Sequence, residues 1–484
     1  VVAAVCGPEA SISVPVSAMA QKQPVIPTAS SPVAARISTA TPASAQASPE
    51  RTSLSSPASR LLRCSGGIAT VKRTENHGLR GQGRPQVYTA PEAWQGTIER
   101  LAWGGLGVGR AEDGRVVLLS APLALFPGEE VEAEVRWKPR HGEGDVLRWL
   151  KPDPRRVPPG CPVASLCGGC ELREAGPAAS ELKRQMVEDL LRRQFSGVAE
   201  WEWKPAPEGA CRHRIQLHWA GRQLGFHRRR SHAIVPVSQC PAAAQVLSSA
   251  IPRLREALEE GALPSRAQRW ELATGTPARE VYASLEDGRA WRLEPDGWHT
   301  TQEAVRHEHG GATLHHRTGG FFQVAAPWAM EAFQGVLEAW DLRGGTLFDL
   351  YGGVGLFSVL LRERFRRFVL VESEPHAVAW ARKNLEAMDA ECHALDASEW
   401  IPEGLGEPAD TLLVDPPRTG LAPAFSEKLK TARAGTLVLV GCDGAAFCRD
   451  VKRLEPEWRL ERLTVLDLFP LTSHAEFVGL LKRA

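Results

Sequence analysis

The sequence lacks three features that would each assign it to a class of protein. Its charges nearly cancel, with 58 Lys and Arg against 57 Asp and Glu, so any contact with nucleic acid must come from local patches. It contains no run of about 20 apolar residues, and we expect no transmembrane helix and no membrane partner. Ten cysteines in 484 residues are too few for a small disulfide scaffold, and their clustering favours metal binding or catalysis in a reducing compartment. We therefore expect a cytoplasmic protein.

Residues 1–90 also lack sustained apolar periodicity. Ala, Ser, Pro and Thr dominate Ser11–Ser59, and such a segment buries too little apolar surface to offset the entropy lost on folding. We expect a disordered tail over residues 1–90, for which an over-extended start site is one explanation. Residues 1–92 contain 9 Lys and Arg and 4 Asp and Glu, which leaves a net charge of −4 on the rest of the chain.

The rest of the sequence predicts three folded regions. Residues 91–152 alternate short apolar runs with Gly and Pro, which is typical of a small β-barrel. Residues 153–325 contain a cysteine cluster and a mixed α/β pattern, with helical periodicity over Glu181–Phe195. Residues 326–484 alternate strands and helices, which predicts a parallel sheet with crossover helices. Further strands are expected at Gln216–Trp219, Val281–Leu285 and Phe321–Val324.

A glycine-rich turn follows an acidic residue in the third region. Asp349 lies near the end of an apolar run, and the glycines of Gly352–Gly355 come directly before a helical stretch. Phe368–Glu372 is a second strand, and an acid at its end is well placed to accept hydrogen bonds from ribose hydroxyls. The GxGxxG fingerprint is absent, and Asp349 would repel a pyrophosphate. The pattern suits a cofactor with a cationic amino-acid end, such as S-adenosylmethionine, and it resembles the first motif of class I methyltransferases.

Other motifs also bring reactive side chains to strand ends. One strand, Thr411–Val414, ends in Asp-Pro-Pro-Arg418, and a second, Leu437–Gly441, is followed by a cysteine. The segment Thr472–Glu476 precedes a closing apolar strand. Open α/β sheets carry ligands and catalytic groups beyond the carboxyl ends of their strands. The residues predicted at such ends are Asp349, Glu372, Asp415 and Cys442.

These residue types fit methylation of uracil at carbon-5. Carbon-5 is a poor nucleophile, but a thiolate that adds to carbon-6 produces an enolate that can accept a methyl group from a sulfonium. A base must then remove the carbon-5 proton so that the thiol can leave. We assign Cys442 as the nucleophile and Glu476 as the base. Taken alone, a strand-end cysteine is more often a small core residue, and an acid such as Glu476 is more often a surface carboxylate.

The chain resembles the class I RNA uracil-5-methyltransferase family over residues 94–484. It looks most like the branch that has an N-terminal TRAM domain and a [4Fe–4S] cluster and that modifies 23S rRNA. This resemblance implies a Rossmann-like class I methyltransferase domain (326–484), an N-terminal OB-like β-barrel (TRAM, 91–152) and a central mixed α/β iron–sulfur domain (153–325). The motifs that carry it are Phe321-Phe-Gln323-Val, Asp349–Gly355, Asp415-Pro-Pro-Arg418, Gly441-Cys442 with Arg449-Asp450, and Phe469–Glu476.

The resemblance also implies the roles of individual residues. It assigns Cys442 and Glu476 to catalysis and puts Asp415 between the cofactor and uracil. The other residues implied or predicted at the S-adenosylmethionine site are Gln323, Asp349, Tyr351, Gly353, Glu372 and Asp396.

Two departures from the family pattern bear on activity. Asp443-Gly444 stands where the family often has Asn-Pro, and an acid beside the nucleophile is expected to raise the thiol pKa and slow its attack. Leu356 stands where the family often has Asn, which would remove one hydrogen bond to the cofactor. These departures leave open an RNA-binding iron–sulfur protein without catalysis. A tRNA substrate for the same chemistry is a further alternative.

Four cysteines form a candidate metal site. Cys161, Cys167 and Cys170 have the spacing C-x5-C-x2-C, and Cys240-Pro follows 70 residues later. Three close thiols and a fourth brought in by folding fit a tetrahedral all-thiolate site, which both zinc and a [4Fe–4S] cluster satisfy. The family resemblance favours the [4Fe–4S] cluster over zinc and over free structural thiols.

A basic segment lies between the third and fourth of these cysteines. Residues 212–232 contain six Arg, four His and no acid, in contrast to the mildly acidic chain around them. Arg side chains bind phosphates and stack on unpaired bases, although a solvated hairpin would have the same composition. We expect RNA as the partner, with 23S rRNA as the leading candidate, and no obligate protein partner. The target uridine must leave its stack to reach the thiol.

Overall fold

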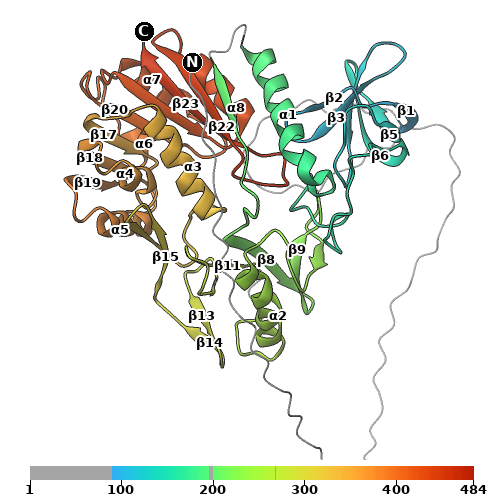
Figure 1. Cartoon of the computed structure of the whole chain (residues 1–484), viewed down its shortest axis with the longest axis horizontal. Helices are drawn as coiled ribbons and strands as arrows, with labels where there is room; N and C mark the ends of the chain where they lie inside the picture. The colour runs from blue at the N-terminus through green and yellow to red at the C-terminus, as the bar shows by residue number, and fades with distance from the viewer. Residues whose placement is uncertain (1–89, 196–199, 267–268) are drawn as a thin grey trace, which may run out of the picture. The chain divides into compact units, whose positions relative to one another are not determined.

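A computed structural model of the chain describes residues 90–195, 200–266 and 269–484. The predicted tail, apart from residue 90, lies outside this part of the chain, so its disorder stays a prediction. The described strands form three larger sheets and one two-stranded sheet (Figure 1). Within the described ranges, no helix is both long enough and apolar enough to cross a membrane.

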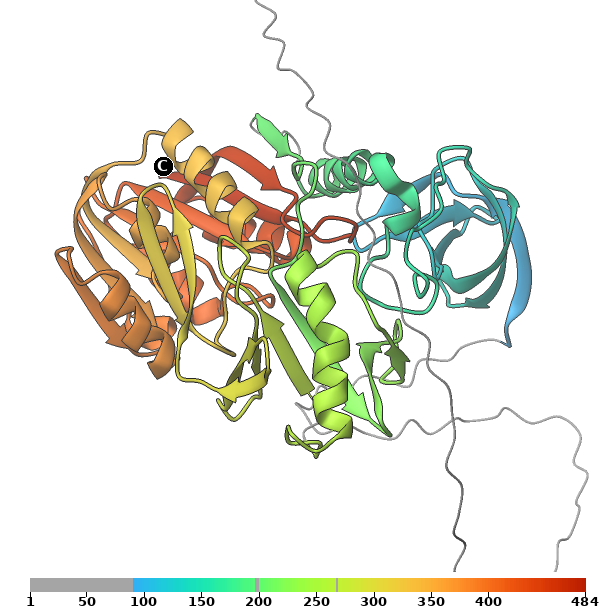
Figure 2. The ribbon, with the colours of Figure 1, turned by 60° about the horizontal axis from the view of Figure 1, so that its bottom comes forward.

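The first sheet is made of six short strands in the region where glycine and proline punctuate the sequence. Its strand order is β1-β5-β6-β4-β3-β2, and it curls around a buried apolar core that includes Ile98, Val117 and Val131 (Figure 2). Neighbouring strands are antiparallel except for β4 and β6, which are parallel. The strands are β1 (Glu92–Thr97), β2 (Arg100–Ala102), β3 (Leu106–Arg110), β4 (Val116–Ser120), β5 (Glu130–Trp137) and β6 (His141–Lys151).

The central sheet has seven antiparallel strands in the order β10-β9-β8-β11-β12-β13-β14. Ile215, Leu217 and Trp219 alternate along β8 and pack in the same core as the apolar side of helix α2. A separate two-stranded sheet, β15-β16, follows. The elements are β8 (Arg214–Ala220), β9 (Gln223–His227), β10 (Ile234–Pro236), α2 (Gln245–Glu259), β11 (Arg269–Ala273), β12 (Tyr282–Ser284), β13 (Ala290–Glu294), β14 (Gly297–Thr300), β15 (Ala304–His309) and β16 (Ala312–Arg317).

The C-terminal sheet has the order β19-β18-β17-β20-β21-β23-β22-β7. Strands β17 to β21 run parallel, as the alternating strand and helix pattern predicts, and β23 is antiparallel to both of its neighbours. The strands are β17 (Gly344–Leu350), β18 (Phe365–Glu372), β19 (Ala390–Ala394), β20 (Thr411–Val414), β21 (Thr436–Gly441), β22 (Trp458–Leu466), β23 (Glu476–Arg483) and β7 (Trp201–Lys204).

Helices cover both faces of the C-terminal sheet because its strands are apolar on both sides. On β20, Leu413 belongs to one core, whereas Leu412 and Val414 belong to the other. Helices α3, α4 and α5 contribute to the first core, and α1, α6, α7 and α8 contribute to the second (Figure 1). The helices are α1 (Ala179–Gln194), α3 (Ala326–Ala339), α4 (Leu356–Leu360), α5 (Pro375–Asn384), α6 (Ala397–Trp400), α7 (Pro423–Thr431) and α8 (Gly444–Leu454).

Helix α1 is shared by two cores. The 3-10 helix η1 (Arg173–Ala178) leads into it, and Leu182 and Met186 pack in the core of the first sheet. Leu190 and Leu191, one to two turns later, pack in the second core of the C-terminal sheet. The helix therefore belongs to both apolar interiors.

Two features of the fold differ from the sequence-based expectations. Phe321–Val324 is not a strand: the segment is irregular and, among the described residues, pairs with no strand. Phe322 is buried, which gives the segment its strand-like apolar pattern, but Val324 accepts a hydrogen bond from the His213 backbone N–H instead of joining a ladder. Strand β7 was not predicted, and it extends the C-terminal sheet by pairing in parallel with β22.

Candidate functional site

The strand ends of the C-terminal sheet meet at one edge. Leu350 pairs with both Val371 and Val414, so the next residues, Tyr351, Glu372 and Asp415, emerge side by side. The antiparallel pair Gly441–Phe477 ends the ladder between β21 and β23. The register therefore brings Cys442 opposite Glu476 at this same edge.

Asp349 is a fully buried acid one residue before the end of β17. Its Oδ2 accepts hydrogen bonds from the Ser358 backbone N–H at 3.2 Å and from the Ser358 hydroxyl at 2.7 Å. Its Oδ1 is buried and has no hydrogen-bond partner in the described part of the chain. Burial raises the pKa of Asp349 to about 7, against the opposing effect of Ser358. An oxygen in this state suits a cationic ligand, which would favour its ionised form.

The glycine-rich turn is tied to the second strand by a carboxylate. Glu372 Oε2 accepts a hydrogen bond from the Gly353 backbone N–H at 3.1 Å. Gly353 and Tyr351 both have left-handed backbones, with φ of 55° and 62°. A Cβ at Gly352 would lie 2.7 Å from the Leu370 side chain, so only glycine fits there without displacement.

Tyr351 and Asp396, two other predicted cofactor residues, interact electrostatically, and Tyr351 also interacts with Glu372. Burial, with the nearby charges of Asp396 and Glu372, raises the pKa of Tyr351 to about 12. Asp396 caps α6 by accepting a hydrogen bond from the Ser398 backbone N–H, and this partner lowers the pKa of Asp396. Gln323 is partly exposed, and within the described ranges it has no hydrogen bond to these residues.

Cys442, Glu476, Asp415 and Arg418 share one electrostatic environment. Burial raises the pKa of Cys442 to about 11, and the charges of Glu476 and Asp415 add to this shift. The Arg418 guanidinium opposes it by charge and by hydrogen bonding. Burial also raises the pKa of Asp415 to about 7 and that of Glu476 well above its usual range. The cluster therefore holds three groups whose neutral forms are favoured, beside one permanent cation.

Arg418, the last residue of the Asp-Pro-Pro-Arg motif, was not assigned a catalytic role from the sequence. Its loop is fixed from α8: the buried Asp450 accepts a hydrogen bond from the Leu421 backbone N–H at 2.7 Å, and Arg449 donates to the Thr419 carbonyl at 2.6 Å. A Cβ at Gly420 would lie 2.0 Å from Asp450 Oδ2, so the loop passes too close for any other residue. The Arg449-Asp450 pair thus supports the loop that carries Arg418.

The structure shows what Asp443, Gly444 and Leu356, the residues that depart from the family pattern, do in the fold. Asp443 is the N-cap of α8 and accepts a hydrogen bond from the Ala446 backbone N–H at 2.8 Å. Burial is the largest cause of the raised thiol pKa, followed by the charges of Glu476 and Asp415, and a slower attack caused by Asp443 stays a prediction. A Cβ at Gly444 would lie 2.5 Å from the Leu190 side chain, so glycine lets α1 pack closely. Leu356 is buried in the apolar core of the sheet.

The loop before Glu476 is held by a buried ion pair that the sequence did not suggest. The ammonium of Lys183 on α1 binds the Asp467 carboxylate and donates to the Phe469 carbonyl at 2.8 Å. Burial lowers the pKa of Lys183 and raises that of Asp467. The indole N–H of Trp328 donates to the Asp467 carbonyl at 2.9 Å. Helices α1 and α3 thereby anchor the segment that presents Glu476.

Buried histidines stack on the segment that precedes Gln323. The Phe322 ring lies 4.4 Å from the His307 ring and 5.0 Å from the His316 ring, with near-parallel planes. The Nε2 atoms of the two histidines lie 3.2 Å apart, and His316 Nδ1 donates to the Arg317 carbonyl at 2.9 Å. The contact between the Nε2 atoms needs one donor and one acceptor, so the pair is satisfied when neutral. Burial lowers the pKa of His307 to about 2 and of His316 to about 4.

The four predicted metal-ligating cysteines line one small cavity of about 30 Å³. Burial raises the pKa of Cys167 and Cys240. Arg212 donates to the Cys170 sulfur at 3.7 Å. Within the described residues, no group of three or more His, Cys, Asp or Glu side chains has the geometry of a metal site. The structure thus brings the four thiols to one cavity but not into a preformed coordination sphere.

This edge of the sheet defines a class of protein. The glycine-rich turn on β17, the acid at the end of β18 and the unpartnered buried Asp349 oxygen together fit an S-adenosylmethionine-dependent methyltransferase. At the same edge a thiol lies opposite a buried carboxylate, and these are the residue types that nucleophilic and general-base catalysis use.

Known proteins resemble the chain over most of its length. A family model described as tRNA (uracil-5-)-methyltransferase matches residues 408–484. A 23S rRNA (uracil(1939)-C(5))-methyltransferase of Chromohalobacter salexigens is 31% identical over 429 residues, which cover 80% of this chain and 89% of that protein. A tRNA (uracil(54)-C(5))-methyltransferase of Pyrococcus furiosus is 28% identical over 411 residues, or 77% of this chain and 97% of that protein.

A solved structure gives the same result. The Pyrococcus abyssi tRNA (uracil-54, C5)-methyltransferase in complex with S-adenosyl-L-homocysteine matches with a TM-score of 0.63 and 25% identity, over 80% of this chain and 100% of that one. The chain belongs to the RNA uracil-5-methyltransferase family. It is an enzyme that uses S-adenosylmethionine to methylate uracil in RNA.

Proposed function

We propose that this enzyme methylates carbon-5 of a uridine in 23S rRNA through a covalent bond between Cys442 and carbon-6. The observation that carries the chemistry is the register that sets Cys442 opposite Glu476, with Asp415 and Arg418 in the same environment. The choice of 23S rRNA is supported by the Chromohalobacter relative, and it would make the reaction cytoplasmic. The tRNA relatives make tRNA the second candidate substrate.

Cys442, Arg418 and Glu476 have separate roles in the proposed reaction. The Cys442 thiol releases its proton to solvent, the thiolate attacks carbon-6, and the electrons of the carbon-5–carbon-6 double bond move onto the carbonyl to give an enolate. Arg418 stabilises the negative charge first on the thiolate and then on the enolate. Bound S-adenosylmethionine supplies the methyl group to carbon-5. Glu476, in the ionised form that the Arg418 cation favours, then takes the carbon-5 proton, the double bond reforms and the thiolate leaves.

The cofactor residues act on different parts of S-adenosylmethionine. The unpartnered Asp349 oxygen suits the cationic amino-acid end, and Glu372, at the end of the second strand, suits the ribose hydroxyls. Gly353 allows the cofactor to approach the backbone, and Tyr351, Asp396 and Gln323 complete the pocket. Asp415 lies between the cofactor and the uracil ring.

The cysteine cluster, the basic segment and the N-terminal barrel form the part of the proposal that concerns RNA binding. We propose that Cys161, Cys167, Cys170 and Cys240 hold a [4Fe–4S] cluster, because their thiols line one cavity and are the right donors for it. The cluster would fix the basic segment 212–232, since Gly168 donates to the His227 carbonyl at 3.1 Å. The domain boundaries at 152 and 325, with a TRAM-like barrel over 91–152, belong to the same proposal.

The experiment is methyl transfer from labelled S-adenosylmethionine to unmodified 23S rRNA and, in parallel, to unmodified tRNA. We expect label in 5-methyluridine of 23S rRNA with the wild type and none with Cys442→Ala. RNA that carries 5-fluorouridine should trap the wild type as a covalent complex that survives denaturation. Label in tRNA alone would replace the substrate. Full activity of Cys442→Ala would overturn the mechanism, and no label in either RNA would favour a protein that binds RNA without catalysis.

A further inference from the structure

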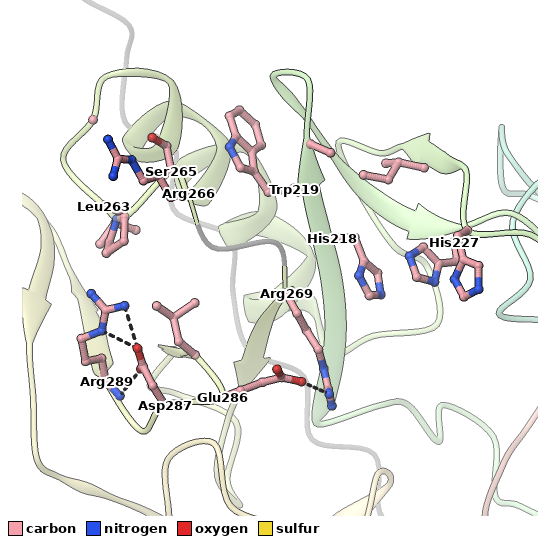
Figure 3. Close-up of a pocket in the computed structure, with 16 residues that line it drawn as sticks. His218, Trp219, His227, Leu263, Ser265, Arg266, Arg269, Glu286, Asp287 and Arg289 are labelled. Atoms are coloured by element: carbon pink, nitrogen blue, oxygen red, sulfur yellow. Dashed lines mark hydrogen bonds and ion pairs between the residues drawn. The ribbon is translucent and has the colours of Figure 1, made fainter. Parts of the chain in front are cut away.

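A cleft of about 1120 Å³ opens on the central sheet, and none of the residues that line it belongs to the reaction site (Figure 3). Strand β8, the β9–β10 hairpin, the start of β11 and the turn between β12 and β13 form its walls. The lining residues that matter here are His218, His227, His232, Arg269, Glu286 and Arg289.

One wall of the cleft is a stack of imidazole rings. The ring centroids of His218 and His227 lie 3.5 Å apart at an interplanar angle of 16°, and His232 meets His227 edge-on at 5.3 Å (Figure 3). Burial lowers the pKa of both His218 and His227, and the neighbouring His232 adds to this effect. At neutral pH the stack is therefore an uncharged aromatic surface, which suits a nucleobase.

Arginines also line the cleft, and Arg269 on β11 is the cross-strand neighbour of His218. Arg269 forms an ion pair with Glu286, and Arg289 pairs with Asp287 at 2.7 Å (Figure 3). Arg266 also lines the cleft, so its three guanidinium groups exceed its two carboxylates. Both ion pairs are largely exposed, and exposed pairs are weak enough for a phosphate to compete for the guanidinium.

Strand β8, which forms part of the cleft, also contacts the segment that precedes Gln323. Arg214, Gln216 and His218 alternate along β8 on the face away from α2. Arg214 lies over the exposed Phe321 ring at 5.6 Å and donates to the Phe322 carbonyl at 3.4 Å. Four residues of strand, or about 13 Å, separate Arg214 from His218. A few nucleotides of single-stranded RNA span that distance.

We propose that this cleft binds unpaired nucleotides of the substrate RNA next to the target uridine. One base stacks on the His218–His227 pair, and Arg266 and Arg269 bind the adjoining phosphates. The inference depends on the proposed function, because the uridine must leave its stack for the reaction, and an RNA loop that presents it also presents unpaired neighbours.

The test is the affinity of the full chain for unmodified transcripts of 23S rRNA and of tRNA, as a function of salt. We expect His218→Ala to weaken binding of the transcript that the enzyme methylates by about fivefold or more, with little change in the salt dependence. Arg269→Ala should weaken binding and lower the slope of log affinity against log salt by about one. His218→Phe keeps an aromatic ring and should restore binding. His299→Ala and Arg306→Ala are matched controls, because both residues are exposed and lie outside the cleft.

Turnover separates the two proposals. Cleft variants should raise the KM for RNA and leave kcat at saturating RNA and the KM for S-adenosylmethionine unchanged. Wild-type affinity of both His218→Ala and Arg269→Ala, or equal losses in the two controls, would overturn the cleft. If the wild type binds RNA but methylates neither transcript, the proposed function fails, whereas the affinity measurements still decide the cleft.

Discussion

Burial has opposite effects on charge in two regions of this enzyme. At the edge of the C-terminal sheet it raises the pKa of Asp349, Asp415 and Glu476, which favours the neutral forms of these acids. Around the central sheet and its neighbours it lowers the pKa of His307 and His316, so that bases are kept neutral. In both regions desolvation disfavours the charged form. In the first region the neutral acids lie at strand ends, whereas in the second the neutral imidazoles stack on Phe322.

The largest expected effect comes from removing one of the buried acids. Glu476→Gln keeps the shape of the side chain but cannot accept the carbon-5 proton, so release of RNA from Cys442 should slow by about 10²- to 10⁴-fold. The adduct should accumulate as a slow band on a denaturing gel. Glu461→Gln, a change on the exposed part of β22, serves as the control. Release at the wild-type rate would mean that another group is the base.

The second prediction tests the buried ion pair between Lys183 and Asp467. Lys183→Met leaves Asp467 buried without its cation, and we expect it to lower the free energy of unfolding by about 3–5 kcal/mol. Chemical denaturation measures this. The double variant Lys183→Met, Asp467→Leu should recover much of the loss, because no lone charge remains buried. A single variant as stable as the wild type would show that the pair does not hold this loop.

The third prediction uses the pKa of Asp349, which is about 7. Its raised value stabilises the fold below pH 3.8, and this contribution is lost as the pH rises through 7. The sign for the cofactor is the reverse, because a cationic ligand prefers the ionised acid. Affinity for S-adenosylmethionine should therefore fall by up to about tenfold per pH unit below pH 7. Calorimetry should find a flatter profile for Asp349→Asn, with the remainder due to Asp415; an unchanged profile would exclude Asp349.

The smallest effect concerns the neutral histidines. His316→Phe preserves the stack on Phe322 but leaves the His307 Nε2 atom without its partner. If the pair positions Gln323, the KM for S-adenosylmethionine should rise by about five- to tenfold, the equivalent of one lost hydrogen bond, with kcat nearly unchanged. Steady-state kinetics separates these constants. A fall in kcat alone would assign the stack to a different step.

Local patterns in the sequence predicted which residues lie at the strand ends, but they did not predict contacts between residues far apart in the chain. Asp349, Asp415 and Cys442 follow apolar runs, so their place at one edge of a parallel sheet could be inferred. The pairing of Lys183 with Asp467 joins residues 284 apart, and no local pattern encodes it. Phe322 has a strand-like environment because histidines from β15 and β16 cover it.

The same limit explains the departure at residue 443. From the sequence, Asp443 is an acid beside a nucleophile, and its charge is the property that stands out. In the structure it is the N-cap of a helix, and its carboxylate is occupied by the Ala446 backbone N–H. The start of α8 after Asp443 creates this role, which the charge of the residue alone did not indicate.

The position of helix α1 has a consequence for the modular description of this enzyme. The helix completes the interiors of both the first sheet and the C-terminal sheet, and β7, which follows it, is an edge strand of the latter. A fragment that starts at residue 326 would leave Phe447 and Phe477 facing water on the side that α1 covers. We therefore expect such a fragment to be much less stable than the full chain. Heat or denaturant should unfold the first sheet and the C-terminal sheet in a single cooperative transition. Loss of strands β1 to β6 should change the reactivity of the Cys442 thiol.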